Sequence, residues 1–347
     1  MTEDTPLSIL VEGVHVTYTV IKALILSIFR FFVPANRKSV QGEIVLVTGS
    51  GGAIGSRICT EFSRLGATLV LWDINERANE QTAEKIRTSG GKCFTYTVDV
   101  GNHDDVYKTG QKVTDEVGEV TILVNNAAVV IGRKLLDCPD HEIEKTFDVN
   151  LLAQFWTVKC FLPAMLRRNH GHIVNIASST GLVGLKNLSD YSSSKYGIVG
   201  FTEVLHYEII FSGYSGVHTT LVCPSFVNTK LFDGCKYRFS DSFIFPRLLS
   251  PLEVNQCVDR IMQAVLTNQI FVCIPRIVYF FTALKTVLPV TAMNALVKYL
   301  GAAQFMDTYV GKPESRNTDI NNTLVENGND NLPRDSDRVD VTRKKDI

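Results

Sequence analysis

Apolar and polar positions follow two different periods along the chain. Between Gly42 and Ile274, short runs rich in β-branched and aromatic side chains alternate with longer segments of helical period, such as Asn75–Thr88 and Ile143–Arg167. The expected strands are Ile44–Val47, Thr68–Trp72, Phe94–Val98, Ile122–Val124, His172–Ala177, Val217–Val222 and Ile270–Ile274. Because these runs are almost continuously apolar, they predict a Rossmann-type α/β fold: a doubly wound parallel sheet of about seven strands, covered by helices on both faces.

A strongly apolar segment, Leu7 to Val33, precedes this region. Its last 20 residues would span about 30 Å as a helix, the thickness of the hydrocarbon core of a bilayer. Because no small-residue cleavage site follows, residues 1–40 are expected to be a retained anchor in contact with membrane lipid, followed by a basic linker. The charged or titratable side chains His15, Lys22 and Arg30 leave a spanning helix and an interfacial helix both open.

Two further regions follow the expected α/β domain, which covers residues 41–276. Residues 277–311 are apolar and aromatic, and they could serve either as a flap over a substrate or as a second membrane contact. Residues 312–347 are rich in polar and charged side chains with few large apolar ones, a composition typical of disordered segments.

Charge and cysteine content exclude several classes of protein. The formal net charge of −1 provides no field that would attract nucleic acid, so no nucleic-acid partner is expected. The eight cysteines are scattered without a Cys-x-x-Cys pair, which indicates buried free thiols in a reducing compartment. No metal site is expected.

The first strand runs directly into a glycine-rich turn, Thr48 to Gly55, that opens a helix. Glycines let the backbone approach a pyrophosphate, whose charge is met by the N–H groups at the start of the helix. Asp73 lies 18 residues after Gly55, where its carboxylate can accept hydrogen bonds from the adenosine ribose and would repel a 2′-phosphate. Because Ile74 offers no positive charge to such a phosphate, the pattern favours NAD over NADP. The turn residues expected to contact it are Gly49, Ser50, Gly51, Ile54 and Gly55.

Tyr191 and Lys195 lie four residues apart at the start of an expected helix, so both side chains should share one face. A tyrosine pKa is ordinarily about 10, which is too high for a general base at neutral pH. Lowering it by about 3 units requires roughly 4 kcal/mol of stabilisation of the phenolate. The Lys195 ammonium and a positively charged nicotinamide are the groups expected to supply it.

Two more polar side chains complete the predicted catalytic set. Ser178 ends the fifth expected strand, 13 residues before Tyr191, and its hydroxyl could hold a substrate oxygen beside the phenol. The adjacent Ser179 is the alternative. Asn150 interrupts a long helical pattern in which asparagine is disfavoured, so it is expected to kink the helix and hold a water linked to Lys195.

In this order, the motifs resemble those of the short-chain dehydrogenase/reductase family over about residues 42–274. The resemblance implies that Tyr191 accepts the substrate proton, that Lys195 lowers the pKa of Tyr191 and binds the nicotinamide ribose, and that Asn150 completes a proton relay. It also implies cofactor contacts by residues that follow other strands, namely Asp99, Val100, Asn126, Ala127 and, after Pro224, Thr229.

Within that family, the chain is similar to the membrane-bound retinol dehydrogenases and lipid-droplet hydroxysteroid dehydrogenases, with the epidermal retinol dehydrogenases nearest in pattern. The segments that carry this similarity are Gly42–Gly49, Leu69–Asn75, Leu136–Asp140, Phe161–Met165, His170–Val174 and Cys223–Thr229. The resemblance implies oxidation of an apolar alcohol, a retinoid or a steroid, with NAD as the cofactor. An aromatic loop, Phe226–Phe245, would line the pocket. Because members of the family commonly form dimers, the resemblance also implies a homodimer.

Three positions depart from the family pattern. Ala53 replaces the second glycine of the turn, Ala128 replaces the glycine that ends the Asn-Asn-Ala motif, and Ser225 replaces the glycine after Pro224. Each adds one small side chain, so weaker cofactor binding is the largest expected effect. The first two also keep open a membrane scaffold that has lost turnover.

The charges around the anchor indicate its orientation. Arg30, Arg37 and Lys38 lie near or beyond the end of the apolar segment, whereas acidic residues precede it, so the positive-inside rule places the enzyme domain in the cytosol. The last four residues, 344–347, resemble a dilysine retrieval signal of the endoplasmic reticulum, which is read from the cytosol. The expected location is therefore the cytosolic face of the endoplasmic reticulum membrane, with lipid droplets as an alternative.

Overall fold

A computed structural model of the chain describes residues 5–32, 36–235, 251–301 and 304–309. Its centre is a parallel sheet of seven strands: β1 (Ile44–Thr48), β2 (Thr68–Asp73), β3 (Cys93–Thr97), β4 (Ile122–Asn125), β5 (Gly171–Ile176), β6 (Val217–Pro224) and β7 (Phe271–Ile274). Every predicted strand is confirmed, with ends that differ by no more than two residues.

The strands lie in the order β3-β2-β1-β4-β5-β6-β7, so the winding direction of the sheet reverses between β1 and β4. The register pairs Val47 of β1 with Leu71 of β2 on one side and with Val124 of β4 on the other. In such sheets, ligands bind outside the carboxyl ends of the strands at the reversal point. The predicted Rossmann-type fold is confirmed, and this reversal point is where a nucleotide cleft is expected.

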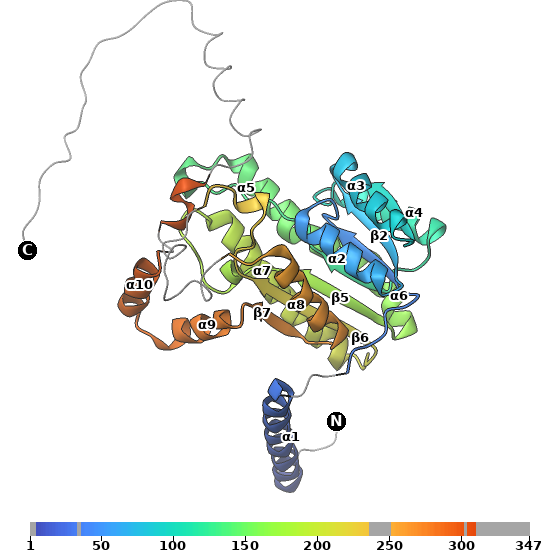
Figure 1. Cartoon of the computed structure of the whole chain (residues 1–347). Helices are drawn as coiled ribbons and strands as arrows, with labels where there is room; N and C mark the ends of the chain where they lie inside the picture. The colour runs from blue at the N-terminus through green and yellow to red at the C-terminus, as the bar shows by residue number, and fades with distance from the viewer. Residues whose placement is uncertain (1–4, 33–35, 236–250, 302–303, 310–347) are drawn as a thin grey trace, which may run out of the picture. The chain divides into compact units, whose positions relative to one another are not determined.

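The longer helices are α1 (Pro6–Phe32), α2 (Ala53–Arg64), α3 (Glu76–Thr88), α4 (His103–Glu116), α5 (Asp140–Phe147), α6 (Ala153–Arg168), α7 (Ser189–Phe211), α8 (Val254–Leu266), α9 (Ile277–Val287) and α10 (Val290–Tyr299). Side chains alternate between the two faces of β1: Val45 and Val47 pack with α2, α3 and α8, whereas Leu46 packs with α4, α6 and α7. Helices α2 and α8 accordingly lie on one face of the sheet and α6 and α7 on the other (Figure 1). Both faces of the sheet are therefore buried, as its continuously apolar strands require.

Asn150 interrupts the long helical segment as the sequence predicts. Helices α5 and α6 are joined by a π-helical turn, η2 (Asp148–Leu152), with Asn150 at its centre and fully buried. Such a turn widens the helix by one residue and occurs often at functional sites. The shorter helical turns are η1 (Leu135–Asp137), η3 (Ser179–Gly181), η4 (Lys230–Phe232) and η5 (Phe305–Thr308).

Helix α1 is the predicted membrane anchor. Residues Pro6–Leu26 are long and apolar enough to cross a membrane, and none of them is buried. The helix begins about two turns before the 20-residue span that the sequence predicts, which starts at Val14, and it ends at Phe32, one residue short of the end of that span. The segment Asp140–Arg168 is also long and apolar, but 39% of its most apolar stretch is buried, because α6 packs against α4 and β5.

Lys38 has a structural role that its position in a basic cluster does not suggest. Its Nζ lies 2.7 Å from Nδ1 of His172 at the base of β5, and its backbone N–H donates to Leu266 O. The His172 Nε2 lies 2.8 Å from the Thr220 hydroxyl. That hydroxyl donates to a backbone carbonyl, so His172 must donate to Thr220 and accept from Lys38. Burial lowers the pKa of Lys38 to about 8.

The apolar extension after β7 forms α9 and α10 and then η5. Several large apolar side chains on the two helices are exposed, among them Phe280 and Val287 on α9 and Tyr299 on α10. By contrast, Phe305 and Met306 of η5 are buried. The predicted polar tail, residues 312–347, lies outside the described residues.

Candidate active site

The predicted site residues lie along the carboxyl edge of the sheet. The glycine turn follows β1, Asp73 ends β2, Asn126 follows β4, and Ser178 lies two residues beyond β5. Because parallel strands end on the same edge, residues up to 130 positions apart in the sequence share one crevice. Helix α7 supplies Tyr191 and Lys195 beside it.

The glycine turn is packed so closely that side chains do not fit at Gly49, Gly51 or Gly55. Gly49 has a left-handed backbone, with φ of 66°, and an added Cβ would lie 2.9 Å from the Cα of Ala127. A Cβ on Gly55 would collide with the carbonyl oxygen of Gly49. Asn126 braces the same turn, donating from Nδ2 to the carbonyl oxygens of Thr48 and Gly49 over 2.9 and 3.1 Å. The turn therefore leaves its outer surface open to a ligand, as the prediction of a pyrophosphate site requires.

Asp73, at the end of β2, is hydrogen-bonded to the backbone of the glycine turn at Gly51. Its Oδ2 accepts a hydrogen bond from Gly51 N and its Oδ1 accepts one from Asn75 N, both over 2.8 Å. The helix cap of α3 is Asn75, whose side chain accepts from Ala78 N, so Asp73 is not needed for that purpose. Ile74 is largely exposed beside it. Each carboxylate oxygen keeps a further lone pair for a ribose hydroxyl.

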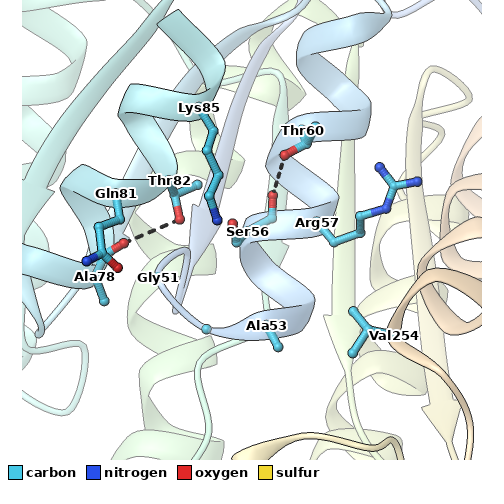
Figure 2. Close-up of a pocket in the computed structure, with 11 residues that line it drawn as sticks. Gly51, Ala53, Ser56, Arg57, Thr60, Ala78, Gln81, Thr82, Lys85 and Val254 are labelled. Carbon is cyan, nitrogen blue, oxygen red and sulfur yellow. Dashed lines mark hydrogen bonds between the residues drawn. The ribbon is translucent and has the colours of Figure 1, made fainter. Parts of the chain in front are cut away.

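A groove of about 320 Å³ begins at the glycine turn and runs between α2 and α3 (Figure 2). The Ala53 side chain lies at its mouth near Val254, and the ammonium of Lys85 points into it from α3 (Figure 2). Ala53, which replaces the second glycine of the family pattern, is the first residue of α2 and is exposed, so its methyl group points to solvent.

Tyr191 and Ser178 meet in the interior of the crevice. Tyr191 is only 4% exposed and Ser178 only 7% exposed. Burial raises the pKa of Tyr191, and a hydrogen bond with the Ser178 side chain acts in the opposite direction. Ser178 Oγ also accepts from Thr180 N over 3.1 Å, which fixes its orientation. Ser179, the alternative considered from the sequence, only begins the turn η3 and is half-buried.

Lys195 lies on the same face of α7 as Tyr191, with its Nζ 5.5 Å from the centre of the tyrosine ring. The ammonium donates to the carbonyl oxygen of Ile176 over 3.0 Å. Burial lowers the pKa of Lys195 to about 7. The sequence predicts a tyrosine pKa that is lowered by Lys195 together with a bound nicotinamide; in the protein alone, burial outweighs the hydrogen bond with Ser178 and raises the pKa of Tyr191. The remaining stabilisation of the phenolate would have to come from a bound cation.

Asn150 connects the crevice to α7. Its side chain exchanges two hydrogen bonds with the backbone of Val129, and its Nδ2 also donates to Ser194 Oγ over 3.1 Å. The Ser194 hydroxyl in turn donates to the backbone oxygen of Tyr191. Asn150 thus ties the loop after β4 to the turn of helix that carries the tyrosine. The predicted water link from Asn150 to Lys195 stays a prediction.

One group of residues near the tyrosine was not predicted from the sequence. Tyr191 belongs to an apolar cluster that also contains Val130, Leu188, Phe305 and Met306. Aromatic content alone suggests a pocket wall at residues 277–311, but nothing in the sequence indicates which of its side chains reach Tyr191. Of the predicted aromatic loop, the structure describes the part up to Cys235, while residues 236–245 lie outside the described residues.

Comparison with known proteins identifies the family. The model for "short chain dehydrogenase" proteins matches residues 43–236, which is more than half of the chain. The chain belongs to the short-chain dehydrogenase family. It is therefore an oxidoreductase, as the motif order predicts.

Two curated relatives extend this similarity over the whole chain. Retinol dehydrogenase 10 of Homo sapiens is 41% identical over 347 residues, covering 93% of this chain and 100% of the relative. Retinol dehydrogenase 10-B of Danio rerio is 41% identical over 340 residues, covering 92% of this chain and 100% of the relative. Both belong to the predicted group of retinol dehydrogenases within the short-chain dehydrogenase family.

Solved structures of other short-chain dehydrogenases share the fold. A member from Burkholderia phymatum in complex with NAD has a TM-score of 0.65 and 25% identity, covering 72% of this chain and 95% of that protein. A metagenomic short-chain oxidoreductase in complex with NADP has a TM-score of 0.51 and 29% identity, covering 54% of this chain and 84% of that protein. Both nicotinamide cofactors therefore occur among its structural neighbours.

The remaining residues that the family pattern singles out follow strands at the carboxyl edge of the sheet. Asp99 and the buried Val100 follow β3, and Asp99 Oδ1 accepts from Gly101 N over 3.0 Å. Thr229 caps η4 after β6, accepting from Leu231 N. Their predicted contacts with the cofactor stay predictions.

Proposed function

We propose that this chain is an NAD-dependent retinol dehydrogenase, which oxidises all-trans-retinol, or a closely similar apolar alcohol, to the aldehyde. The observation that carries the proposal is the buried group of Tyr191, Ser178 and Lys195 beside a glycine turn that is braced by Asn126. The 41% identity to retinol dehydrogenase 10 supports a retinoid substrate.

Each residue has a distinct part in this reaction. Oxidation removes a proton from the hydroxyl and a hydride from the carbinol carbon, and the bound nicotinamide supplies the hydride acceptor. Ser178 Oγ hydrogen-bonds the alcohol oxygen, and the Tyr191 phenolate takes its proton. Lys195 would favour that phenolate against the burial that raises the pKa of Tyr191, and a bound nicotinamide would add its positive charge.

The surroundings of Tyr191 support an apolar alcohol. Among the buried residues of its cluster, Val130, Leu188, Phe305 and Met306 are all apolar, and the partly buried Phe226 and Phe232 extend the wall. A small polar alcohol would gain little from such walls, whereas a long hydrocarbon gains about 25 cal/mol for each Å² that it buries.

A substrate panel tests this proposal directly. Purified full-length protein is assayed in detergent micelles with retinol, a hydroxysteroid and a fatty alcohol, each with NAD and with NADP. NADH formation that is fastest with retinol is the expected result. A clear preference for the steroid would instead identify a hydroxysteroid dehydrogenase, and NAD binding without turnover of any alcohol would indicate a scaffold.

Asp73→Asn should reduce the preference for NAD over NADP by about ten- to a hundredfold. The substitution keeps a side-chain oxygen that can accept from Gly51 N, but it removes the charge that would repel a 2′-phosphate. The measurement is the ratio of kcat/KM for the two cofactors with a single alcohol. Asp99→Asn is the matched control and should leave that ratio unchanged. An unchanged ratio in Asp73→Asn would show that Asp73 does not select the cofactor.

Helix α1 and the dilysine pattern at 344–347 bear on where the protein is located in the cell. We infer that α1 anchors the protein in the endoplasmic reticulum membrane with the α/β domain in the cytosol, and that lipid droplets are a second location. The dilysine pattern at 344–347 supports retrieval to the endoplasmic reticulum. Protease added to intact microsomes should digest the α/β domain, and protection of that domain would place it in the lumen.

A homodimer is the expected assembly. Helix α7 exposes a row of apolar side chains, Val204, Tyr207, Ile210 and Phe211, and the last of these is 82% exposed. Rows of this kind are uncommon on monomers and mark contact surfaces. Chemical cross-linking in detergent should give a dimer, which Phe211→Glu should weaken.

A further inference from the structure

The chain returns to the active site after α10 and closes over Tyr191. Residues 305–309, called here the C-terminal strap, lie more than 110 positions beyond the tyrosine in the sequence. Phe305 and Met306 are 3% and 4% exposed and share one buried cluster with Tyr191. Neither side chain has any role in the steps described above.

Aromatic rings join the strap to the tyrosine. The Phe232 ring meets the Tyr191 ring edge-on at 5.9 Å between centroids. Phe305 lies 6.3 Å from Phe232 and 3.9 Å from Phe226. Phe226 and Phe232 follow β6, whereas Phe305 comes from the strap, so two distant segments build one aromatic wall beside the phenol.

Polar contacts from the last three residues of the strap hold it in place. The Tyr309 hydroxyl donates to Val130 O over 3.2 Å, and the Thr308 hydroxyl donates to Gly234 O over 2.7 Å. Asp307 Oδ1 accepts from Lys186 Nζ over 2.9 Å and from Asn187 Nδ2 over 3.3 Å. The strap is thus attached to the loop after β4, the loop after β6 and the segment just before α7.

Gly132 provides independent evidence that the strap is fitted to this place. A Cβ at this position would collide with the Tyr309 ring and lie 2.8 Å from Cε of Met306. Its backbone φ of 75° is one that residues with side chains rarely adopt. The loop after β4 therefore comes close to the strap only because it carries glycine at this position.

We propose that the C-terminal strap is the outer wall of the substrate pocket and that Phe305 and Met306 determine which alcohols fit. The proposal rests on the proposed oxidation of an apolar alcohol at Tyr191. Both side chains belong to the same buried cluster as Tyr191, so an alcohol whose oxygen reaches the phenol would lie near them. Their bulk would then admit a slender polyene alcohol more readily than a wide fused-ring alcohol.

Truncating the wall should widen the specificity. Phe305→Ala and Met306→Ala are each expected to raise kcat/KM for a hydroxysteroid relative to retinol by about tenfold, since one or two methylenes in an apolar pocket change discrimination by about 10- to 200-fold. The ratio of the two substrates is measured in a single enzyme preparation, so a partly unfolded sample does not change it. Gly132→Ala should shift the ratio in the same direction by displacing Tyr309 and Met306.

Two controls separate the wall from general packing. Phe280→Ala makes the same truncation on the exposed surface of α9 and should leave the ratio unchanged. Met306→Leu keeps the volume of the side chain and should leave the ratio within about twofold. If the wild-type protein oxidises retinol but the two alanine variants keep its ratio, the strap proposal alone is wrong. If the wild-type protein oxidises no alcohol, both the strap proposal and the proposed function are wrong.

Discussion

Tyr191→Phe is expected to lower kcat for retinol oxidation by about a thousandfold while NAD affinity changes by less than about twofold. The substitution removes only the hydroxyl that takes the substrate proton, and general acid–base groups typically contribute about 10²- to 10⁴-fold. The ring stays in place, because its contacts with Phe232 and with the apolar cluster are unchanged. Steady-state NADH formation gives kcat, and quenching of protein fluorescence by NAD gives the affinity.

A matched substitution on the same helix tests whether the loss is specific. Tyr196 lies five residues further along α7, is 38% exposed, and hydrogen-bonds to Leu182 O. Tyr196→Phe also removes a single tyrosine hydroxyl, and activity should stay within about threefold of wild type. If Tyr191→Phe retained comparable activity, the proton would have another acceptor and the proposed role of Tyr191 would be wrong.

The second large effect is expected in the glycine turn, where Gly55→Ala should weaken NAD binding strongly. An added Cβ would collide with the Gly49 carbonyl oxygen and would lie 2.9 Å from Asn126 Nδ2, so both sides of the turn must shift. Overpacking of this kind costs about 1–3 kcal/mol, and a shift that removes the pyrophosphate contacts should weaken NAD by about a hundredfold. Calorimetric titration with NAD measures the affinity, and thermal unfolding measures the loss of stability.

The natural departure at Ala53 supplies the control within the same turn. Ala53→Gly restores the family residue at an exposed position, so it should fold normally and bind NAD as well as, or better than, wild type. Unchanged NAD affinity in Gly55→Ala would mean that the nucleotide does not lie on this turn.

Local patterns made most of the fold predictable. Each strand is a short apolar run bounded by polar residues or glycine, and the period of the flanking segments differs clearly from that of the strands. The π-turn at Asn150 was also predictable as a kink, because asparagine is a disfavoured residue inside a helix. The positions of Ser178 after β5, and of Tyr191 and Lys195 on one face of α7, followed from the strand pattern and from the four-residue spacing.

What could not be predicted depends on contacts between distant segments. The strap reaches Tyr191 from more than 110 residues away, and its contacts with Val130 and Gly132 have no signature in any local window. Lys38 looked like one of several charges beside a membrane anchor, but it is hydrogen-bonded to His172 at the base of the sheet. The burial that raises the pKa of Tyr191 in the protein alone was also not visible in the sequence, because it depends on how deeply α7 is buried.

A single-turnover experiment tests the central claim most directly. Full-length enzyme in molar excess over all-trans-retinol is mixed with NAD, NADH is followed by absorbance, and retinal is quantified by chromatography. We predict equal amounts of NADH and retinal, formed at a rate that Tyr191→Phe slows by about a thousandfold. NAD that binds to the wild-type protein without producing NADH from retinol or any other apolar alcohol would contradict the account.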